Sequence, residues 1–185
     1  MADSLFDLAR SAHACPALSE EPLLAGFVAY WEAKRGAREV PEKRDIDPTE
    51  IDRALLPYIA IGELEGGARV RYRLVGTGIT GRHGIDATGK YVDEVLRGAY
   101  GDYIRGLLAE TTRKRRPIYS EAVSRHGGGQ YLRVKRVMMP LSDGGREIRF
   151  IIGAQLILSP PEQNDRQIRW YRGDGALQEI VRVVF

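Results

Sequence analysis

Apolar residues recur at helical spacing in two segments of this chain. Residues 20–35 and 100–113 carry apolar side chains three or four positions apart, the pattern of a helix that buries one face. Pro22 stands in the first turn of the earlier segment and Gly36 follows its last residue, as is typical of a helix start and a helix end. The apolar face of this earlier helix belongs either to the core of the chain or to a contact with a second copy.

Alternating apolar and polar positions predict five strands, at residues 58–65, 69–75, 117–125, 130–139 and 147–158. Tyr72 and Leu74 are expected on the same face of the second strand. Glycine pairs and triplets predict tight hairpin turns, and the glycine-rich residues 76–97 predict short helical turns and loops. A hairpin, short helices, one longer helix and three more strands predict an α+β fold, a five-stranded antiparallel sheet with helices on one face.

The same pattern divides the chain into four parts. Residues 1–19 are expected to form a flexible arm with a short helix at 5–10, and residues 20–36 form the N-terminal helix. Residues 37–160 form the main domain, and residues 161–185 form a C-terminal extension. This extension is too apolar for disorder, and its residues suit a strand as well as a helix.

Composition indicates an ordinary globular protein. The 185 residues are 43% hydrophobic and 29% charged, with a net charge of +3. No secretory signal begins the sequence and no run approaches the ~20 apolar residues that span a bilayer, so we expect a cytoplasmic protein that binds neither membrane nor nucleic acid. The basic run at 113–116 favours a solvated helix end over an acid-binding patch. The single cysteine, Cys15, excludes an internal disulfide and is expected as a surface thiol in the arm.

A set of structural motifs extends from Trp31 to Leu141. The set consists of Trp31, Arg35-Gly36, Pro41, Asp45-Ile46-Asp47-Pro48, Leu56-Pro57, Arg73-Leu74-Val75-Gly76-Thr77, Thr88-Gly89-Lys90, Arg116-Pro117 and Met139-Pro140-Leu141. Together with the order of elements over residues 20–158, it resembles the PAS domain. Within that family it is similar to a bacterial subfamily of small stand-alone proteins found mainly in alphaproteobacteria.

The resemblance implies a sensory or adaptor module and not an enzyme. Many PAS domains pair through a helix that precedes the first strand, so we expect a homodimer in which Leu24, Phe27 and Trp31 form the contact. Any output then passes through a partner protein, which the sequence does not identify. The alternative is a purely structural interaction and dimerisation module with a filled core, and a small enzyme is the third, least favoured hypothesis.

A small-molecule pocket between the sheet and its helices is the candidate site that the resemblance implies. The expected lining residues are Tyr72, Leu74, Tyr103, Leu107, Tyr119 and Met139. The alternative is that these side chains only fill the core. A small organic ligand fits this expectation, but no resident cofactor does. Of His13, His83 and His126, only His83 lies near the pocket cover, which is a weak basis for heme, and Cys15 lies too far upstream for a flavin–cysteine adduct.

Catalytic and metal-binding patterns are weak. Ser120, Ser124 and His126 are close in sequence but lie on one strand without a nucleophile-elbow pattern. The glycines at 76, 78 and 81 mimic a dinucleotide fingerprint, yet no parallel β-α-β unit follows them. Asp47 is expected to cap a short helix that starts at Pro48 and runs through Leu56, and Asp45 is expected to pair with Arg44 or Arg73. We therefore expect no metal site.

Overall fold

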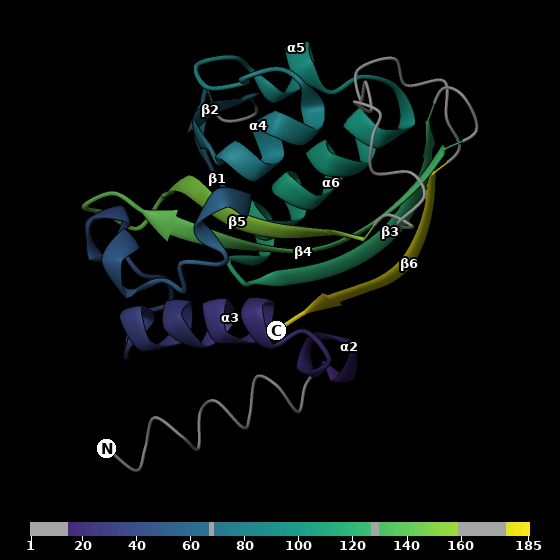
Figure 1. Ribbon diagram of the computed structural model, residues 1–185. Helices are drawn as coiled ribbons and strands as arrows, with labels where there is room; N and C mark the ends of the chain where they lie inside the picture. The colour runs from purple at the N-terminus through teal and green to yellow at the C-terminus, as the bar shows by residue number, and fades with distance from the viewer. Residues whose placement is uncertain (1–14, 67–68, 127–129, 159–176) are drawn as a thin grey trace.

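Six strands form one antiparallel sheet (Figure 1). The computed structural model describes residues 15–66, 69–126, 130–158 and 177–185, and of residues 82, 83, 125, 126, 130 and 131 the backbone alone. The strands are β1 (Ile59–Glu65), β2 (Arg69–Val75), β3 (Ile118–His126), β4 (Gln130–Ser142), β5 (Ile148–Leu158) and β6 (Leu177–Val184), in the spatial order β2-β1-β5-β4-β3-β6. The first five strands are those that the alternation pattern predicts.

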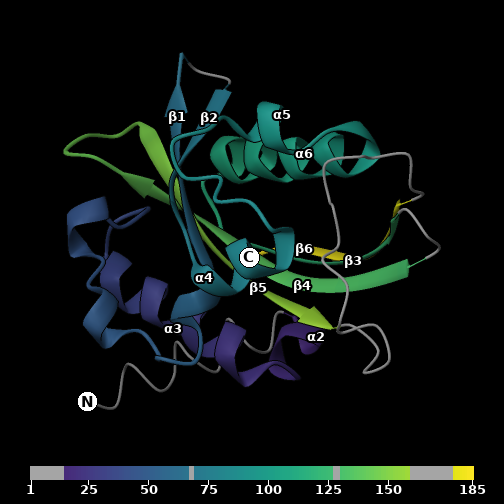
Figure 2. The same ribbon diagram turned by 45° about the horizontal axis from the view of Figure 1, so that its top comes forward.

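Helices cover both faces of this sheet (Figures 1 and 2). On one face lie α4 (Thr77–His83), α5 (Val92–Val95) and α6 (Gly98–Lys114), and on the other lie α2 (Pro16–Ser19) and α3 (Pro22–Arg35). Single 3-10 turns at Lys43–Asp45, Pro48–Glu50 and Leu56–Tyr58 connect α3 to β1. None of the helices in the described ranges is long and apolar enough to cross a membrane.

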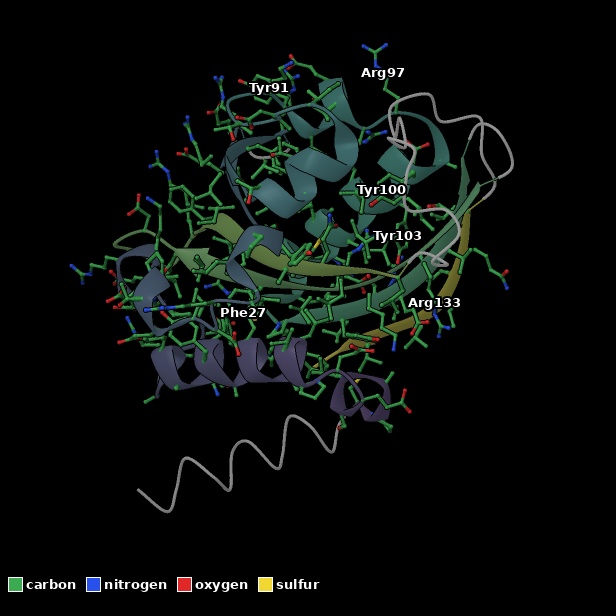
Figure 3. The ribbon with its side chains drawn as sticks, viewed as in Figure 1. Phe27, Tyr91, Arg97, Tyr100, Tyr103 and Arg133 are labelled. Carbon is green, nitrogen blue, oxygen red and sulfur yellow. The ribbon has the colours of Figure 1, made fainter. Side chains whose placement is uncertain are left out.

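Helix α3 closes the lower face of the sheet through its apolar stripe. Leu24, Phe27 and Trp31 are at most 3% exposed within the single chain, and Figure 3 shows Phe27 between α3 and the sheet. The indole Nε1 of Trp31 donates a hydrogen bond of 2.9 Å to the carbonyl oxygen of Pro140, in β4. Of the two alternatives for this stripe, the structure shows the core. The residues expected at a dimer contact are therefore not free to meet a second copy.

Cys15 is buried, which corrects the expectation of a surface thiol. Its side chain is fully enclosed beside Leu18, where α2 packs beneath the sheet with α3. Burial raises the pKa of the Cys15 thiol. The part of the arm that holds the expected helix at residues 5–10 lies outside the described residues.

The C-terminal extension adds a sixth strand to the expected five. β6 pairs with the free edge of β3, so that Ser120 lies opposite Arg182. Val181 and Val183 pack toward the α3 side of the sheet, while Leu177 and Val184 pack toward the α6 side. The apolar content of the extension is explained by this pairing, because each face of the strand contacts one of the two cores.

The segment before β1 contains turns where a helix was expected. Asp47 does accept a hydrogen bond of 2.9 Å from the backbone N–H of Thr49, but the turn that it caps ends at Glu50. Asp45 pairs with Arg38 at 2.7 Å, not with Arg44 or Arg73. It also accepts a 2.8 Å hydrogen bond from the backbone N–H of Glu42, so its role is structural.

Glycines let α4 approach the 3-10 turn before β1. A Cβ atom at Gly76 would lie 2.2 Å from the carbonyl oxygen of Pro57, and one at Gly78 would lie 2.6 Å from the ring of Tyr58. No real side chain tolerates such contacts, so both positions require glycine for packing. Two of the three glycines that mimic a dinucleotide fingerprint, Gly76 and Gly78, thus serve the close packing of α4 on Pro57 and Tyr58, whereas Gly81 has open space around it.

Candidate functional site

A small cavity lies between the sheet and the three helices α4, α5 and α6. Its volume is about 100 Å³, and its walls are mainly aliphatic and aromatic side chains. It exists because the centre of the sheet carries small residues on this face: Ala60 of β1 stands directly opposite Gly153 of β5. Val92 and Val95 of α5 and Ile104 of α6 form part of the opposite wall.

One charged side chain lies in this apolar wall. Arg136 of β4 lines the cavity and is 2% exposed. Its neighbours across the sheet are Gln155 on β5, which also lines the cavity, and Ser120 on β3. A row of polar residues therefore crosses this face of the sheet.

The guanidinium of Arg136 is only partly satisfied. Its Nη2 donates a hydrogen bond of 3.1 Å to the hydroxyl of Tyr100, and its charge lies 5.4 Å from the ring centre of Tyr100 and 5.6 Å from that of Tyr103. Nε and Nη1 are buried and have no hydrogen-bond partner among the described residues. Within the same residues no carboxylate forms an ion pair with Arg136. A buried cation in this condition is costly unless something neutralises it.

Three tyrosines surround the guanidinium and remain neutral hydroxyls. Burial raises the pKa of Tyr72 far above its ordinary value, and it also raises the pKa values of Tyr100 and Tyr103. The nearby charge of Arg136 opposes the increase in each case but does not reverse it. Figure 3 shows Tyr100 and Tyr103 on the side of α6 that faces the sheet. Among the described residues, the charge of Arg136 thus lies beside neutral tyrosine hydroxyls.

Arg182 of β6 extends the polar row but is already paired. It forms ion pairs of 2.7 Å with Glu110 and 2.5 Å with Glu179, and its guanidinium lies 5.6 Å from the centre of the Tyr103 ring. Glu110 and Glu179 are therefore paired with Arg182. Neither of them forms an ion pair with Arg136.

Comparison with known proteins gives a family. A model of the PAS domain matches residues 20–156, which is most of the chain. The chain belongs to the PAS domain family. A comparison with curated proteins gives no match.

Several solved structures resemble this PAS domain in shape at low sequence identity. The LOV domain from the Erythrobacter litoralis EL346 blue-light activated histidine kinase is 16% identical, with a TM-score of 0.44 over 57% of this chain and 99% of that one. A fungal LOV domain photoreceptor is 14% identical, with a TM-score of 0.46 over 72% and 90% of the two chains. The Rhodobacter sphaeroides LOV protein is 13% identical, with a TM-score of 0.44 over 63% and 65%.

Two of the expected pocket residues lie on the wrong side of the sheet. Tyr119 and Met139 are fully buried, but they pack in the core beneath α3. Their chain neighbours Ile118 and Met138 face the α6 side, and Met138 lines the cavity. Because successive side chains of a strand point to opposite faces, an error of one residue changes the face.

Leu74 was also misplaced, and the cause is a β-bulge. On β2, Tyr72 stands opposite Gly62 and Leu74 stands opposite Ile61, so Arg73 is an extra residue in the ladder. Tyr72 lines the cavity as expected, but after the bulge it is Val75 that does so. Leu74 is 44% exposed.

The remaining two expected residues lie near the cavity without lining it. Tyr103 and Leu107 are buried in the core between α6 and the sheet. Tyr103 takes part in the site through its ring, which lies beside Arg136. The sequence reading therefore found one lining residue, Tyr72, and one neighbour of the charged centre.

Arg136 is the functional residue that sequence reasoning missed. It lies two residues from Val134 and two from Met138, both of which face the α6 side, so its position in the alternation marks it as inward. The inward position of Arg136 is hard to recognise from the sequence, because two adjacent basic residues are both buried. Lys135, which precedes Arg136, is buried on the opposite face of the sheet.

The other chemical candidates are the cysteine, the three histidines and a metal site. Cys15 lies on the α3 side of the sheet, away from the cavity. The side chains of His13, His83 and His126 lie outside the described residues. In the described part of the chain, no group of three His, Cys, Asp or Glu side chains is placed to hold a metal ion.

Proposed function

We propose that this chain is a sensory PAS module that binds a small organic ligand in the cavity beneath α4, α5 and α6 and signals through a partner protein. The observation that carries the proposal is the cavity itself. Apolar cavities with a few polar groups are the usual form of small-molecule sites. The sheet forms one wall of it, and the short helices α4 and α5 together with the longer α6 form the other.

The helices above the cavity are suited to report its occupancy. α5 is four residues long and α4 is seven residues long. Val92 and Val95 of α5 and Ile79 of α4 line the cavity, so an occupant contacts both helices. Short elements with few buried contacts are the parts of a fold that shift most easily. A partner that contacts this cover would distinguish the empty state from the occupied one.

The proposed activity is binding without catalysis. The tyrosine hydroxyls in the site are held neutral by burial, and a general base must titrate near the working pH to be effective. Arg136 supplies a positive charge and hydrogen-bond donors but no acceptor for a proton.

The second candidate is an interaction module that needs no ligand. It is favoured by the size of the cavity, because about 100 Å³ is below the ~300–1,000 Å³ of typical ligand pockets. Either form is proposed to act in the cytoplasm. A homodimer remains part of the proposal, but it must use a surface other than the buried face of α3. Light scattering at micromolar concentration tests it, and a monomeric protein would remove it.

Ligand binding is tested by filling the cavity. Ala60→Leu places a larger side chain opposite Gly153, whereas Ala54→Leu makes the same change at an exposed position. A thermal-shift screen of small organic acids, amides and alcohols should find compounds that stabilise the wild type and Ala54→Leu but not Ala60→Leu. If no compound in any class stabilises the wild type, or if Ala60→Leu responds as the wild type does, the ligand-binding proposal is wrong.

A further inference from the structure

The polar part of the cavity has a definite chemistry. Arg136 lies in the wall with two N–H groups that find no acceptor among the described residues, and it is 2% exposed. The ordinary fate of a buried guanidinium is to pair with a carboxylate, often through two parallel hydrogen bonds. The described part of the chain supplies no such carboxylate to Arg136. Arg136 is therefore a buried cation that could form an ion pair with the carboxylate of a ligand.

The groups around Arg136 offer hydrogen-bond donors to an anion. Arg182, on the same face of the sheet next to Ser120, is already paired with Glu110 and Glu179 and adds no free charge. The tyrosine hydroxyls are neutral and can donate hydrogen bonds. Ser120 Oγ is a further buried polar atom on this face of the sheet.

The apolar part of the cavity limits the size of the occupant. A cavity of about 150 Å³ lined by Leu, Ile and Phe is large enough for benzene, and this cavity is about 100 Å³. On this scale a body of about four carbon atoms fits without moving a helix. Val75, Val95 and Ile104 provide aliphatic contacts for it.

We propose that the ligand of this PAS domain is a small monocarboxylate whose carboxylate pairs with Arg136 and whose short apolar body occupies the cavity beside Val95 and Ile104. The inference rests on the proposed ligand-binding function and adds the class of ligand and its anchor. Nε of Arg136, one of the two unpartnered nitrogens, is the donor to the carboxylate, and Tyr100 holds the guanidinium in place through the bond from Nη2. Arg136 is thus the residue that determines specificity for an anion.

The test compares acids with their uncharged isosteres. Isovalerate and isovaleramide have nearly the same shape, as do benzoate and benzamide, and sodium phosphate serves as an anion without an apolar body. Isothermal titration calorimetry in low-chloride buffer measures each against the wild type, Arg136→Met, Arg136→Lys and the exposed control Arg116→Met. We expect at least one of the two acids to bind the wild type about tenfold or more tighter than its amide, as a charge-assisted hydrogen bond implies.

The variants separate the anchor from the fold. The preference for the acid should disappear in Arg136→Met, persist in weaker form in Arg136→Lys, which keeps the charge but loses the fork, and be unchanged in Arg116→Met. The melting temperature of each free variant shows that it has folded.

Failure of this inference differs from failure of the proposed function. If an amide binds as tightly as its acid, if Arg136→Met keeps the preference, or if phosphate alone binds, the carboxylate inference is wrong although a small ligand remains possible for the cavity. If neither the acids and amides nor any compound of the thermal-shift screen binds, both the inference and the proposed function are wrong.

Discussion

Replacing Arg136 by methionine should leave the free protein about as stable as the wild type, which is an unusual expectation for a side chain that is 2% exposed. The substitution removes a buried charge and its two unpartnered donors and leaves an unbranched apolar side chain of similar reach. If the role of Arg136 is to bind a ligand, it contributes little to the stability of the ligand-free protein.

The magnitude follows from opposing contributions. Each buried donor without a partner costs about 1–3 kcal/mol, and Arg136 has two of them. Against this, the variant loses the hydrogen bond to Tyr100, about 1.5–3 kcal/mol for a charged donor. It also loses cation–π contacts with the rings of Tyr100 and Tyr103, about 0.5–2 kcal/mol each. The central values of the gain and the loss, about 4 and about 5 kcal/mol, nearly cancel, so we expect the free energy of unfolding to change by less than about 2 kcal/mol, in either direction.

The assay is urea denaturation followed by circular dichroism, with Lys135→Met as the matched control. Lys135 precedes Arg136 on the same strand, is 6% exposed, and is paired with Glu21 at 2.6 Å on the opposite face. Removing one member of a buried pair costs about 3–5 kcal/mol, and we expect the lower end because Glu21 is partly exposed. A loss above about 3 kcal/mol in Arg136→Met, equal to a broken buried pair, would refute the reasoning.

Three further predictions concern the fold. Trp31→Ala should lower the free energy of unfolding in urea by about 3–5 kcal/mol, because the indole is fully buried, and a loss below about 1 kcal/mol would show that α3 packs loosely. Gly76→Ala should lower the melting temperature sharply because its Cβ meets backbone, whereas Gly26→Ala, in open space within α3, should add up to about 1 kcal/mol; similar effects would contradict the packing described. Burial acts to raise the pKa of Glu63, but hydrogen bonds from Arg73 and Arg149 outweigh burial and lower that pKa. The Glu63 carboxylate therefore stabilises the fold above its unfolded-state pKa, and this stabilisation is lost as the pH falls through the folded-state pKa. Glu63→Gln should therefore flatten the acid side of the stability–pH curve, and an unchanged acid side would contradict the assignment.

The fold could be read from the sequence because its elements are locally determined. Alternation and hairpin glycines placed the first five strands, and the spacing of apolar residues placed α3 and α6 within two residues at their ends. The fate of the C-terminal extension could not be read, because pairing with β3 depends on an edge far away in the sequence. The contact of Trp31 with Pro140 is likewise a long-range event that joins two of the sequence motifs.

The site was harder to predict because both faces of the sheet are covered. With α3 on one face and α6 on the other, inward and outward positions of β3 and β4 are equally apolar, so Tyr119 and Met139 looked as suitable as Ile118 and Met138. The bulge in β2 moved the inward position from Leu74 to Val75, and nothing in local composition marks it. The unpaired state of Arg136 is a property of the assembled fold alone.

The most direct test of the account is the ¹⁵N–¹H spectrum of the arginine side chains during a titration with isovalerate, with benzoate as the alternative acid. The Nε–H signal of Arg136 is assigned through its absence in Arg136→Met. We predict that this signal moves to a position typical of a carboxylate-bound guanidinium as the cavity fills. The signal of the exposed Arg116 should stay in place. A titration with both acids in which the Arg136 signal does not move, or in which exposed arginines alone respond, would contradict the claim that this PAS domain senses a small carboxylate.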